Sequence, residues 1–323
     1  MKIVSVVAFL VVLAASSWWF IEEQRSPHGL AENSVKVAVS LTPLSTPFFI
    51  AQEQGFFTKH GLDVEIMPCK GGVKCANLLQ EDKVDYATAS ETVALFNRYH
   101  HSNVSILSSF VRSSNDLKLL ALEANKIGKL SDLAGKKVGI VKSSSSEFYF
   151  DLLLITHALQ DLQVERVYLQ PDELVAALLS YQVDAISIWE PYGYRATLVS
   201  ASPLVNLGTE GVYQLSFNLL SKSVRAGDRK EQDRLLLRAL SDAIEWIEAN
   251  PDDSIDLISQ ELGILPQQVN WAWNDYVFEL TNDYSLLSNL QLQARWASER
   301  NILEGAPVDV RALVDYQLLE TVD

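Results

Sequence analysis

Residues 181–192 read YQVDAISIWEPY, and this stretch decides the fold. An apolar, β-branched run that ends in a Trp-Glu-Pro-Tyr corner is typical of a buried strand followed by a turn. The earlier stretch KVDYATASE, residues 83–91, repeats the same skeleton. In this alignment Asp85 corresponds to Asp184, and Glu91 corresponds to Glu190. The chain therefore contains an internal repeat that closes on two equivalent strands.

The segments that precede the two stretches also match. Each copy begins with a short strand, at residues 35–41 and 137–142, which leads into a helix. A second strand that ends near a proline follows, at residues 62–68 and 164–171, and then a short helix. Strands that alternate with helices in this way pair in parallel with right-handed crossovers. We therefore predict an α/β protein with two βαβαβ-based lobes, whose ligand lies beyond the carboxyl ends of the strands.

The order of the repeats predicts how the chain is divided. Lobe 1 is expected to comprise residues 35–121 and 213–323, and lobe 2 residues 122–212, so the chain crosses near residues 122 and 212. Two crossings make a hinge that can absorb closure around a ligand. Beyond the second crossing the pattern turns helical, and these helices are expected to pack on lobe 1. They are expected at residues 232–249, 271–280, 284–296 and 308–319.

Composition narrows the class of protein. The 323 residues, 48% of them hydrophobic and 21% charged, describe a globular protein of about two domains. The formal net charge of −15 argues against a nucleic-acid partner, because phosphates demand basic residues. The histidines have no zinc-binding spacing, and no G-x-S-x-G elbow is present. We expect no catalytic residue, no metal and no cofactor.

The first residues indicate export. Lys2 precedes the uncharged residues 3–21, and Trp18 and Trp19 stand near the end of that run. A basic start before an apolar run is typical of an export signal, and this run is just long enough to span a bilayer. Residues 1–34 are therefore expected to be a signal peptide or a signal anchor plus linker. The body is expected in the periplasm, tethered to the inner membrane by residues 3–21 if they are retained.

The only two cysteines, Cys69 and Cys75, bracket the loop CKGGVKC. In an oxidising compartment two nearby cysteines are expected to form a disulfide. Two free thiols near the end of a strand remain the alternative.

The ends of the strands supply the candidate ligand-binding residues. The serine run at residues 143–146 precedes a helix, where free N–H groups and hydroxyls make an anion site, although serines also cap helices. Glu91 and Glu190 favour a ligand with an amine, whereas the serine run favours an acidic one. An amphoteric or heterocyclic solute would satisfy both the glutamates and the serines. Trp189 and Tyr192 could form an aromatic wall. The candidates are Thr42, Ser45, Thr46, Ser90, Glu91, Ser143, Ser144, Ser145, Trp189, Glu190 and Tyr192.

Several of these segments resemble a known family. PFFIAQEQGFF at residues 47–57 and GLDVE at residues 61–65 resemble the opening of solute-binding proteins of the nitrate/sulfonate/taurine/thiamine-pyrimidine-precursor type. LSDLAGKKVG at residues 130–139 is similar to the opening of their second lobe, and VDA with WEPY, within residues 183–192, to its closing strand. The resemblance implies a bilobed type II periplasmic-binding fold.

The resemblance also implies a function. It implies the extracytoplasmic solute-binding component of an ABC importer, which captures a small organic or anionic solute by lobe closure and delivers it to an inner-membrane permease with its ATPase. The solute would be like a sulfonate, taurine, nitrate or a pyrimidine, with its acidic group at the serine run. A membrane-anchored sensory receptor is the alternative. An enzyme like the pyrimidine-precursor synthases is a second alternative, although Cys69 and Cys75 do not match the cysteine-rich iron motif of those enzymes.

Overall fold

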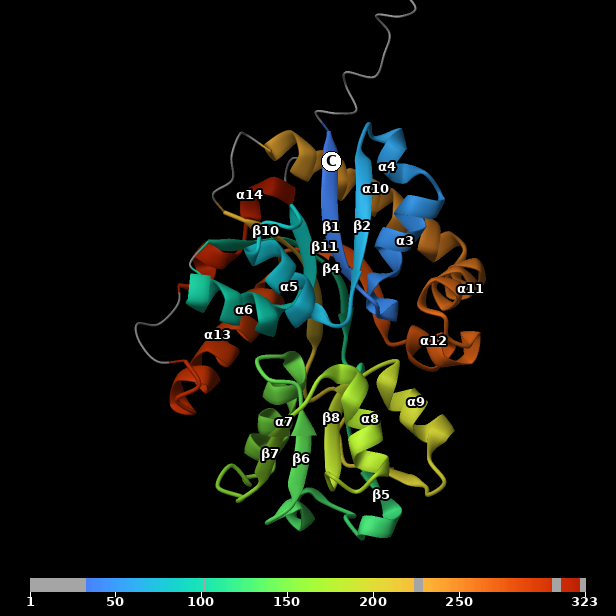
Figure 1. The fold of residues 1–323 in the computed structure, drawn as a ribbon. Coiled ribbons are helices and arrows are strands. Elements are labelled where there is room, and N and C mark those ends of the chain that lie inside the picture. Colours follow the sequence, from blue (N-terminus) through green and yellow to red (C-terminus); the bar gives the residue numbers. More distant parts are fainter. Residues whose placement is uncertain (1–32, 102, 224–228, 304–308, 320–323) are drawn as a thin grey trace, which may run out of the picture.

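The structure, a computed structural model, describes residues 33–101, 103–223, 229–303 and 309–319. Two α/β bodies lie one above the other, and they are called lobe 1 and lobe 2 below (Figure 1). The predicted signal peptide or anchor lies outside the described residues, apart from its last two positions. Within the described segments, no helix has both the length and the apolar character needed to cross a membrane.

Lobe 1 is built on a six-stranded sheet. Its strand order is β11-β4-β10-β3-β1-β2, in which β1 pairs in parallel with β2 and β3, and β10 runs antiparallel between β3 and β4. The central strands are buried on both faces, which suits their β-branched and small residues. The strands are β1 (Ser34–Ser40), β2 (Asp63–Cys69), β3 (Tyr86–Ser90), β4 (Val104–Ser113), β10 (Leu215–Lys222) and β11 (Tyr276–Thr281).

Helices cover both faces of this sheet (Figure 1). Pro47 stands in the first turn of α3, where its missing N–H costs nothing, and Gly55, with φ of 70°, follows the end of the helix. One face carries η1 (Pro43–Ser45), α3 (Thr46–Glu53), α4 (Phe56–Lys59), α10 (Lys230–Ala249), α11 (Pro251–Leu262) and α12 (Pro266–Trp273). The other carries α5 (Gly72–Gln80), α6 (Glu91–His101) and α13 (Tyr284–Glu299), and η4 (Val310–Leu313) and α14 (Tyr316–Leu319) follow.

Lobe 2 is built on a five-stranded sheet in the order β7-β6-β8-β5-β9. Strand β6 pairs in parallel with β7 and β8, and β5 runs antiparallel to β8 and β9. Its strands are β5 (Leu117–Leu122), β6 (Lys137–Ile140), β7 (Glu165–Tyr168), β8 (Ala185–Trp189) and β9 (Leu204–Asn206). Its helices are η2 (Glu123–Asn125), η3 (Leu130–Leu133), α7 (Ser145–Thr156), α8 (Pro171–Leu179) and α9 (Tyr192–Val199).

The internal repeat is visible in the hydrogen bonds. Asp85 precedes β3, and its Oδ2 accepts from the Lys36 N–H at 2.8 Å, while its own N–H donates to the Lys36 carbonyl at 2.8 Å. Asp184 precedes β8 and makes the same two bonds with Lys137, also at 2.8 Å each. Each aspartate therefore fastens the third strand of its unit to the first. The two units share the orders β2-β1-β3 and β7-β6-β8.

Two expectations from the sequence need correction. Residues 117–121 were assigned to lobe 1, but they belong to β5 and pair with β8 in the sheet of lobe 2. The first crossing therefore lies between β4 and β5, at residues 114–116, rather than near residue 122. Residues 271–280 were expected to be helical, but α12 ends at Trp273 and β11 begins at Tyr276. Pairing with β4 outweighs the helical pattern there, because Tyr276 and Phe278 become buried on that edge of the sheet.

Candidate functional site: the cleft between the lobes

A cavity of about 510 Å³ lies where the strand ends of the two lobes meet. Lobe 1 lines it with the segments that follow β1, β2 and β3, with α6 and with β10. Lobe 2 lines it with the segments that follow β6 and β7, and with Trp189 at the end of β8. The cavity therefore occupies the place where open α/β sheets bind ligands.

The cavity receives the N-terminal ends of four helices. Residues at or just before the first turns of α5, α6, α7 and α8 all line it. A helix N-terminus carries a partial positive charge and free N–H groups, so it favours an anion. Lys70, Lys74 and Lys142 add three positive side chains to the lining. The cavity is therefore locally positive in a protein whose formal net charge is −15.

The serine run divides into serines whose hydroxyls hold the turn and serines whose hydroxyls have no partner in the described part of the protein. Ser144 is the N-cap of α7: its Oγ accepts from the Ser146 N–H at 3.2 Å and donates to the Val141 carbonyl at 2.7 Å. Ser146 is fully buried, and its Oγ accepts from the Val141 N–H at 3.3 Å. Ser143 and Ser145 also line the cavity, and their hydroxyls make no hydrogen bond to any of the described residues. Ser143 and Ser145 are therefore the two serines that are free to bind a ligand.

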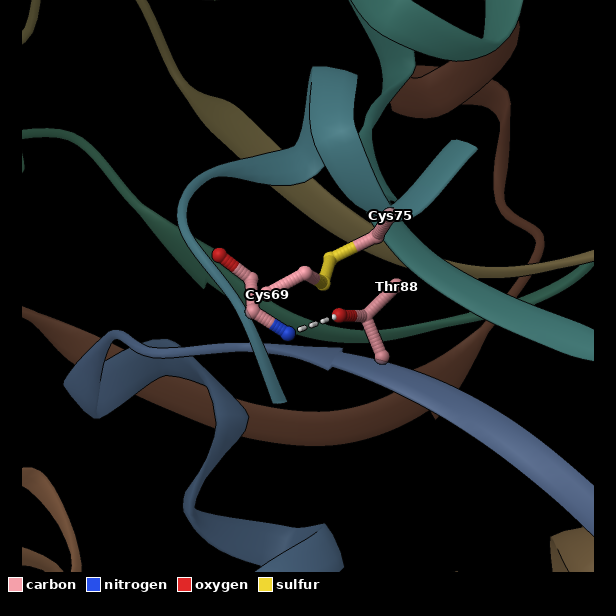
Figure 2. The surroundings of a disulfide bond; sticks show 4 residues. Cys69, Cys75 and Thr88 are labelled. Atoms are coloured by element: carbon pink, nitrogen blue, oxygen red, sulfur yellow. Dashed lines mark hydrogen bonds between the residues drawn. A yellow bond between two sulfur atoms is a disulfide. The ribbon is translucent and has the colours of Figure 1, made fainter. Parts of the chain in front are cut away.

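The predicted Cys69–Cys75 disulfide is present, with the two Cα atoms 5.6 Å apart. Figure 2 shows it beside Thr88 of β3. All five residues between the cysteines, residues 70–74, line the cavity. The loop is tightly packed, because a Cβ at Gly71 would lie 3.2 Å from the Trp189 ring and one at Gly72 would lie 2.9 Å from the Ala89 Cα. The disulfide thus fixes a cavity wall made of main chain and lysines.

Apolar and aromatic side chains form the rest of the lining. Trp189 is half-buried, and its ring meets that of Tyr192 edge to face with centroids 6.2 Å apart. Phe96 and Phe217 line the cavity from lobe 1, and Tyr168 lines it from lobe 2. A pocket with apolar walls and a few polar groups is typical of a site for a small organic molecule.

Asp116 is the one carboxylic acid among the described residues that line the cavity. It stands on the crossing between β4 and β5 and is 1% exposed. Its Oδ1 accepts from the Tyr276 hydroxyl at 3.0 Å, whereas its Oδ2 has no partner among the described residues. Burial, together with the charge of the neighbouring Glu190, raises the pKa of Asp116 to about 8. A buried carboxyl with one unpaired oxygen and a raised pKa is typical of a group that binds a ligand.

The structure brings six of the predicted residues to the cavity and leaves five away from it. Thr42, Ser90, Ser143, Ser144, Ser145 and Trp189 line it. Ser45 and Thr46 are buried at the start of α3, where the Thr46 hydroxyl donates to the Pro43 carbonyl at 2.6 Å. Tyr192 begins α9 and packs behind Trp189.

The two glutamates of the repeat are engaged inside the protein instead. The Glu91 carboxylate is fully buried and accepts from the Tyr213 hydroxyl, the Ser216 hydroxyl at 3.1 Å and the Gln293 amide at 3.0 Å. The Glu190 carboxylate accepts from the Tyr194 N–H at 2.8 Å. Burial raises the pKa of both carboxyls. Neither glutamate lines the cavity, so the amine-binding role expected of them has no support in this geometry.

Sequence reasoning missed part of the lining. Asp116 carries no motif, and only its place between two strands at a crossing could have drawn attention to it. Lys74 lies in the cysteine loop, for which the sequence predicts only a disulfide. His100 and His101 come from the far end of α6 and reach the cavity through the packing of that helix against lobe 2. No group of three metal-binding side chains occurs among the residues that the structure describes.

The lobes also touch outside the cavity. Lys70 Nζ and Asp172 Oδ2 lie 2.8 Å apart at its rim. Trp296 of α13 donates from Nε1 to Asp151 Oδ2 of α7 at 2.9 Å. Two lobes that contact each other around a cavity at their strand ends define the class of periplasmic solute-binding folds, as the sequence predicts.

Comparisons with known proteins agree with this class. The alkanesulfonate-binding protein SsuA from Xanthomonas axonopodis pv. citri, solved bound to MOPS, matches with a TM-score of 0.76 at 18% identity, over 88% of this chain and 98% of that one. SsuA from Escherichia coli matches with a TM-score of 0.73 at 18% identity, over 88% and 92% of the two chains. These two structures confirm the predicted type II periplasmic-binding fold.

The sequence comparisons give the family. A protein of Bacillus subtilis (strain 168) that carries the name of an aliphatic sulfonates-binding protein is 28% identical over 238 residues, which is 71% of this chain and 69% of the relative. The family model described as NMT1/THI5 like matches residues 42–254. The chain therefore belongs to the NMT1/THI5-like family, and the resemblance found in the sequence is confirmed.

Proposed function

We propose that this protein is the extracytoplasmic solute-binding component of an ABC importer and that it captures a small organic anion by closure of its two lobes. The observation that carries the proposal is the interlobe cavity, which receives four helix N-termini and three lysine side chains. Such a site attracts an acidic group, and its aromatic walls accept an organic body better than a bare inorganic ion.

A sulfonate is the acidic group that we favour. Its three oxygens accept hydrogen bonds from several N–H and hydroxyl groups at once, which suits the start of α7 with Ser143 and Ser145. The Bacillus subtilis relative carries a sulfonate-binding name, and SsuA of Xanthomonas axonopodis pv. citri was solved with MOPS, an organic sulfonate. Taurine, nitrate and pyrimidines remain the other solutes to be tested.

The proposed partners and location follow from this role. A receptor of this kind meets its solute in the periplasm and delivers it to an inner-membrane permease with its ATPase. Residues 1–34 act as the export signal in this proposal, with residues 3–21 as the tether where they are retained. The proposed act is binding and release without chemistry, and the Bacillus subtilis relative likewise carries the name of a binding protein.

Calorimetry and thermal unfolding of the purified full-length protein test the proposal. The panel contains alkanesulfonates, taurine, nitrate, pyrimidines and carboxylates. A Ser145→Glu variant sets a carboxylate at the start of α7, and Ser298→Glu places the same charge on the exposed surface of α13. We expect an organic anion to stabilise the wild type and Ser298→Glu but not Ser145→Glu. An anion that binds all three proteins equally would refute the cavity as its site, and a panel without any binder would refute the proposed function.

A further inference from the structure

We infer that Asp116 is a specificity-determining residue of the cavity, and that the solute is an organic anion that also carries a hydrogen-bond donor, an ammonium or a hydroxyl group, for the Asp116 carboxyl. The inference rests on the proposed function and deepens it, because it assigns a second polar contact to the same ligand. The lysine ammonium groups and the N–H groups at the helix starts can only donate hydrogen bonds, so they suit the acidic group of the ligand and not a donor on it.

One oxygen of the Asp116 carboxyl is unmatched among the described residues. The Asp116 side chain is held in place by the Tyr276 hydroxyl, which donates to Oδ1 at 3.0 Å. The main chain is held as well, because the Glu190 N–H donates to the Asp116 carbonyl at 3.1 Å. Oδ2 nevertheless has no partner within the described segments. Buried polar atoms are almost always hydrogen-bonded, so a fixed and unmatched carboxyl oxygen at a cavity wall indicates that the bound molecule completes it.

The charges around Asp116 also favour a donor on the ligand. Glu190 and Asp275 both act on it as negative neighbours, whereas Lys118 is the positive one. The Lys118 ammonium is directed to Asn115, with Nζ 2.5 Å from the Asn115 Oδ1. The surroundings of Asp116 therefore hold an excess of carboxyl groups. A hydrogen-bond donor on the ligand, above all a positively charged one, offsets the negative charge of these carboxyl groups, whereas a second acidic group on the ligand would add to it.

Asp116 stands between the two lobes. It lies on the short crossing between β4 of lobe 1 and β5 of lobe 2, where closure moves the chain. Tyr276 comes from the sheet of lobe 1, and Glu190 follows β8 of lobe 2. A ligand that contacts both Asp116 and the start of α7 therefore joins the hinge segment to lobe 2. Such a ligand favours the closed state more than one that lacks the donor.

Matched ligands test the inference by calorimetry on the full-length protein. One set of ligands is used for each chain length from ethane to hexane. Each set contains the unsubstituted alkanesulfonate and its terminal amino and hydroxy derivatives. The variants are Asp116→Asn and, as the control, Asp275→Asn, which removes a neighbouring charge from a residue that does not line the cavity. We expect at least about tenfold tighter binding of one donor-bearing ligand than of its unsubstituted partner in the wild type and in Asp275→Asn, and loss of this preference in Asp116→Asn.

The outcomes separate the inference from the proposed function. Equal affinities within every set would overturn the inference and leave the anion-binding function intact, whereas no binding by any sulfonate would overturn both. Titration in buffers of different ionisation enthalpy separates the two donors. Burial raises the pKa of Asp116, so its carboxyl holds a proton near neutral pH. Binding of an ammonium ligand should release this proton, whereas binding of a hydroxyl ligand should not. Equal proton release by the wild type and Asp116→Asn would contradict the assignment to this residue.

Discussion

Lys70 of lobe 1 and Asp172 of lobe 2 form an ion pair across the rim of the cavity, with Nζ and Oδ2 2.8 Å apart. Lys70 follows β2 inside the disulfide loop, and Asp172 stands in the first turn of α8. The hydrogen bond from Lys70 lowers the pKa of Asp172. Beside this pair, the Trp189 ring and Pro171 of lobe 2 lie against Gly71. The rim is therefore a place where the two lobes are in contact.

The ion pair should tune ligand affinity only slightly. Both side chains are largely exposed, at 62% for Lys70 and 42% for Asp172, and exposed ion pairs contribute little. We expect Asp172→Asn to weaken solute binding a few-fold at low ionic strength and to have no effect at high ionic strength, because salt screens exposed charges. Calorimetry at the two ionic strengths measures this. A large loss that salt does not change would mean that Asp172 contacts the solute.

The disulfide should affect both stability and binding. Its loop is short, so its removal is expected to cost roughly 2 kcal/mol of unfolding free energy. Affinity should fall as well, because residues 70–74 all line the cavity and lose their fixed shape. Chemical denaturation and calorimetry, with and without a reductant, measure the two effects. The Cys69→Ser/Cys75→Ser double variant is the control, since a reductant should leave it unchanged, and a reduced wild type with full affinity would contradict the prediction.

The fold could be predicted because its signals are local and repeated. Two copies of one strand–helix–strand pattern and the aspartates Asp85 and Asp184 fix the parallel units, and the structure has both. The predictions are wrong where pairing between strands that are distant in the sequence decides the structure. Strand β11 sits in a helical pattern and exists because β4 offers an edge, and β5 belongs to lobe 2 because β8 is its neighbour. Sequence periodicity does not show which strand is the partner.

The site could be predicted only in part for a similar reason. A residue at the end of a parallel strand lies near the cavity by topology, as Ser90 and Trp189 do. Whether its side chain faces the cavity depends on packing. Glu91 follows Ser90 directly, yet its carboxylate is directed to Tyr213 and Gln293, which come from distant segments. Asp116 and Lys74 were missed because the crossing and the loop that carry them have no pattern of their own.

The two neighbouring serines Ser144 and Ser145 should behave differently when each is changed to alanine. Ser144 caps α7, so Ser144→Ala is expected to lower the unfolding free energy by roughly 1 kcal/mol. Ser145 lines the cavity, and its hydroxyl has no hydrogen bond to the described residues, so Ser145→Ala should leave stability nearly unchanged and weaken anion binding. Denaturation and calorimetry of both variants separate the roles. Equal losses of stability, with no change in affinity for either, would contradict the assignment.

Asp116 should make folding stability depend on pH. Its ordinary pKa is 3.8, which describes the unfolded chain, and burial raises its pKa to about 8 in the folded protein. Between these values the folded protein holds a proton that the unfolded chain has lost. Stability should therefore fall as the pH rises from about 4 to about 8, and this contribution should level off above that range.

The variant Asp116→Asn isolates this contribution. Glu91 and Glu190 also have raised pKa values, and both remain in the variant, so the difference between the two proteins reports on Asp116. We expect the wild type to lose stability relative to Asp116→Asn with rising pH, by up to about 1.4 kcal/mol per pH unit. Urea denaturation of both proteins across this range measures the difference, with Asp275→Asn as the control. Parallel curves for the wild type and Asp116→Asn would mean that Asp116 is already ionised in the folded protein, and the donor on the ligand would then meet a carboxylate without displacing a proton.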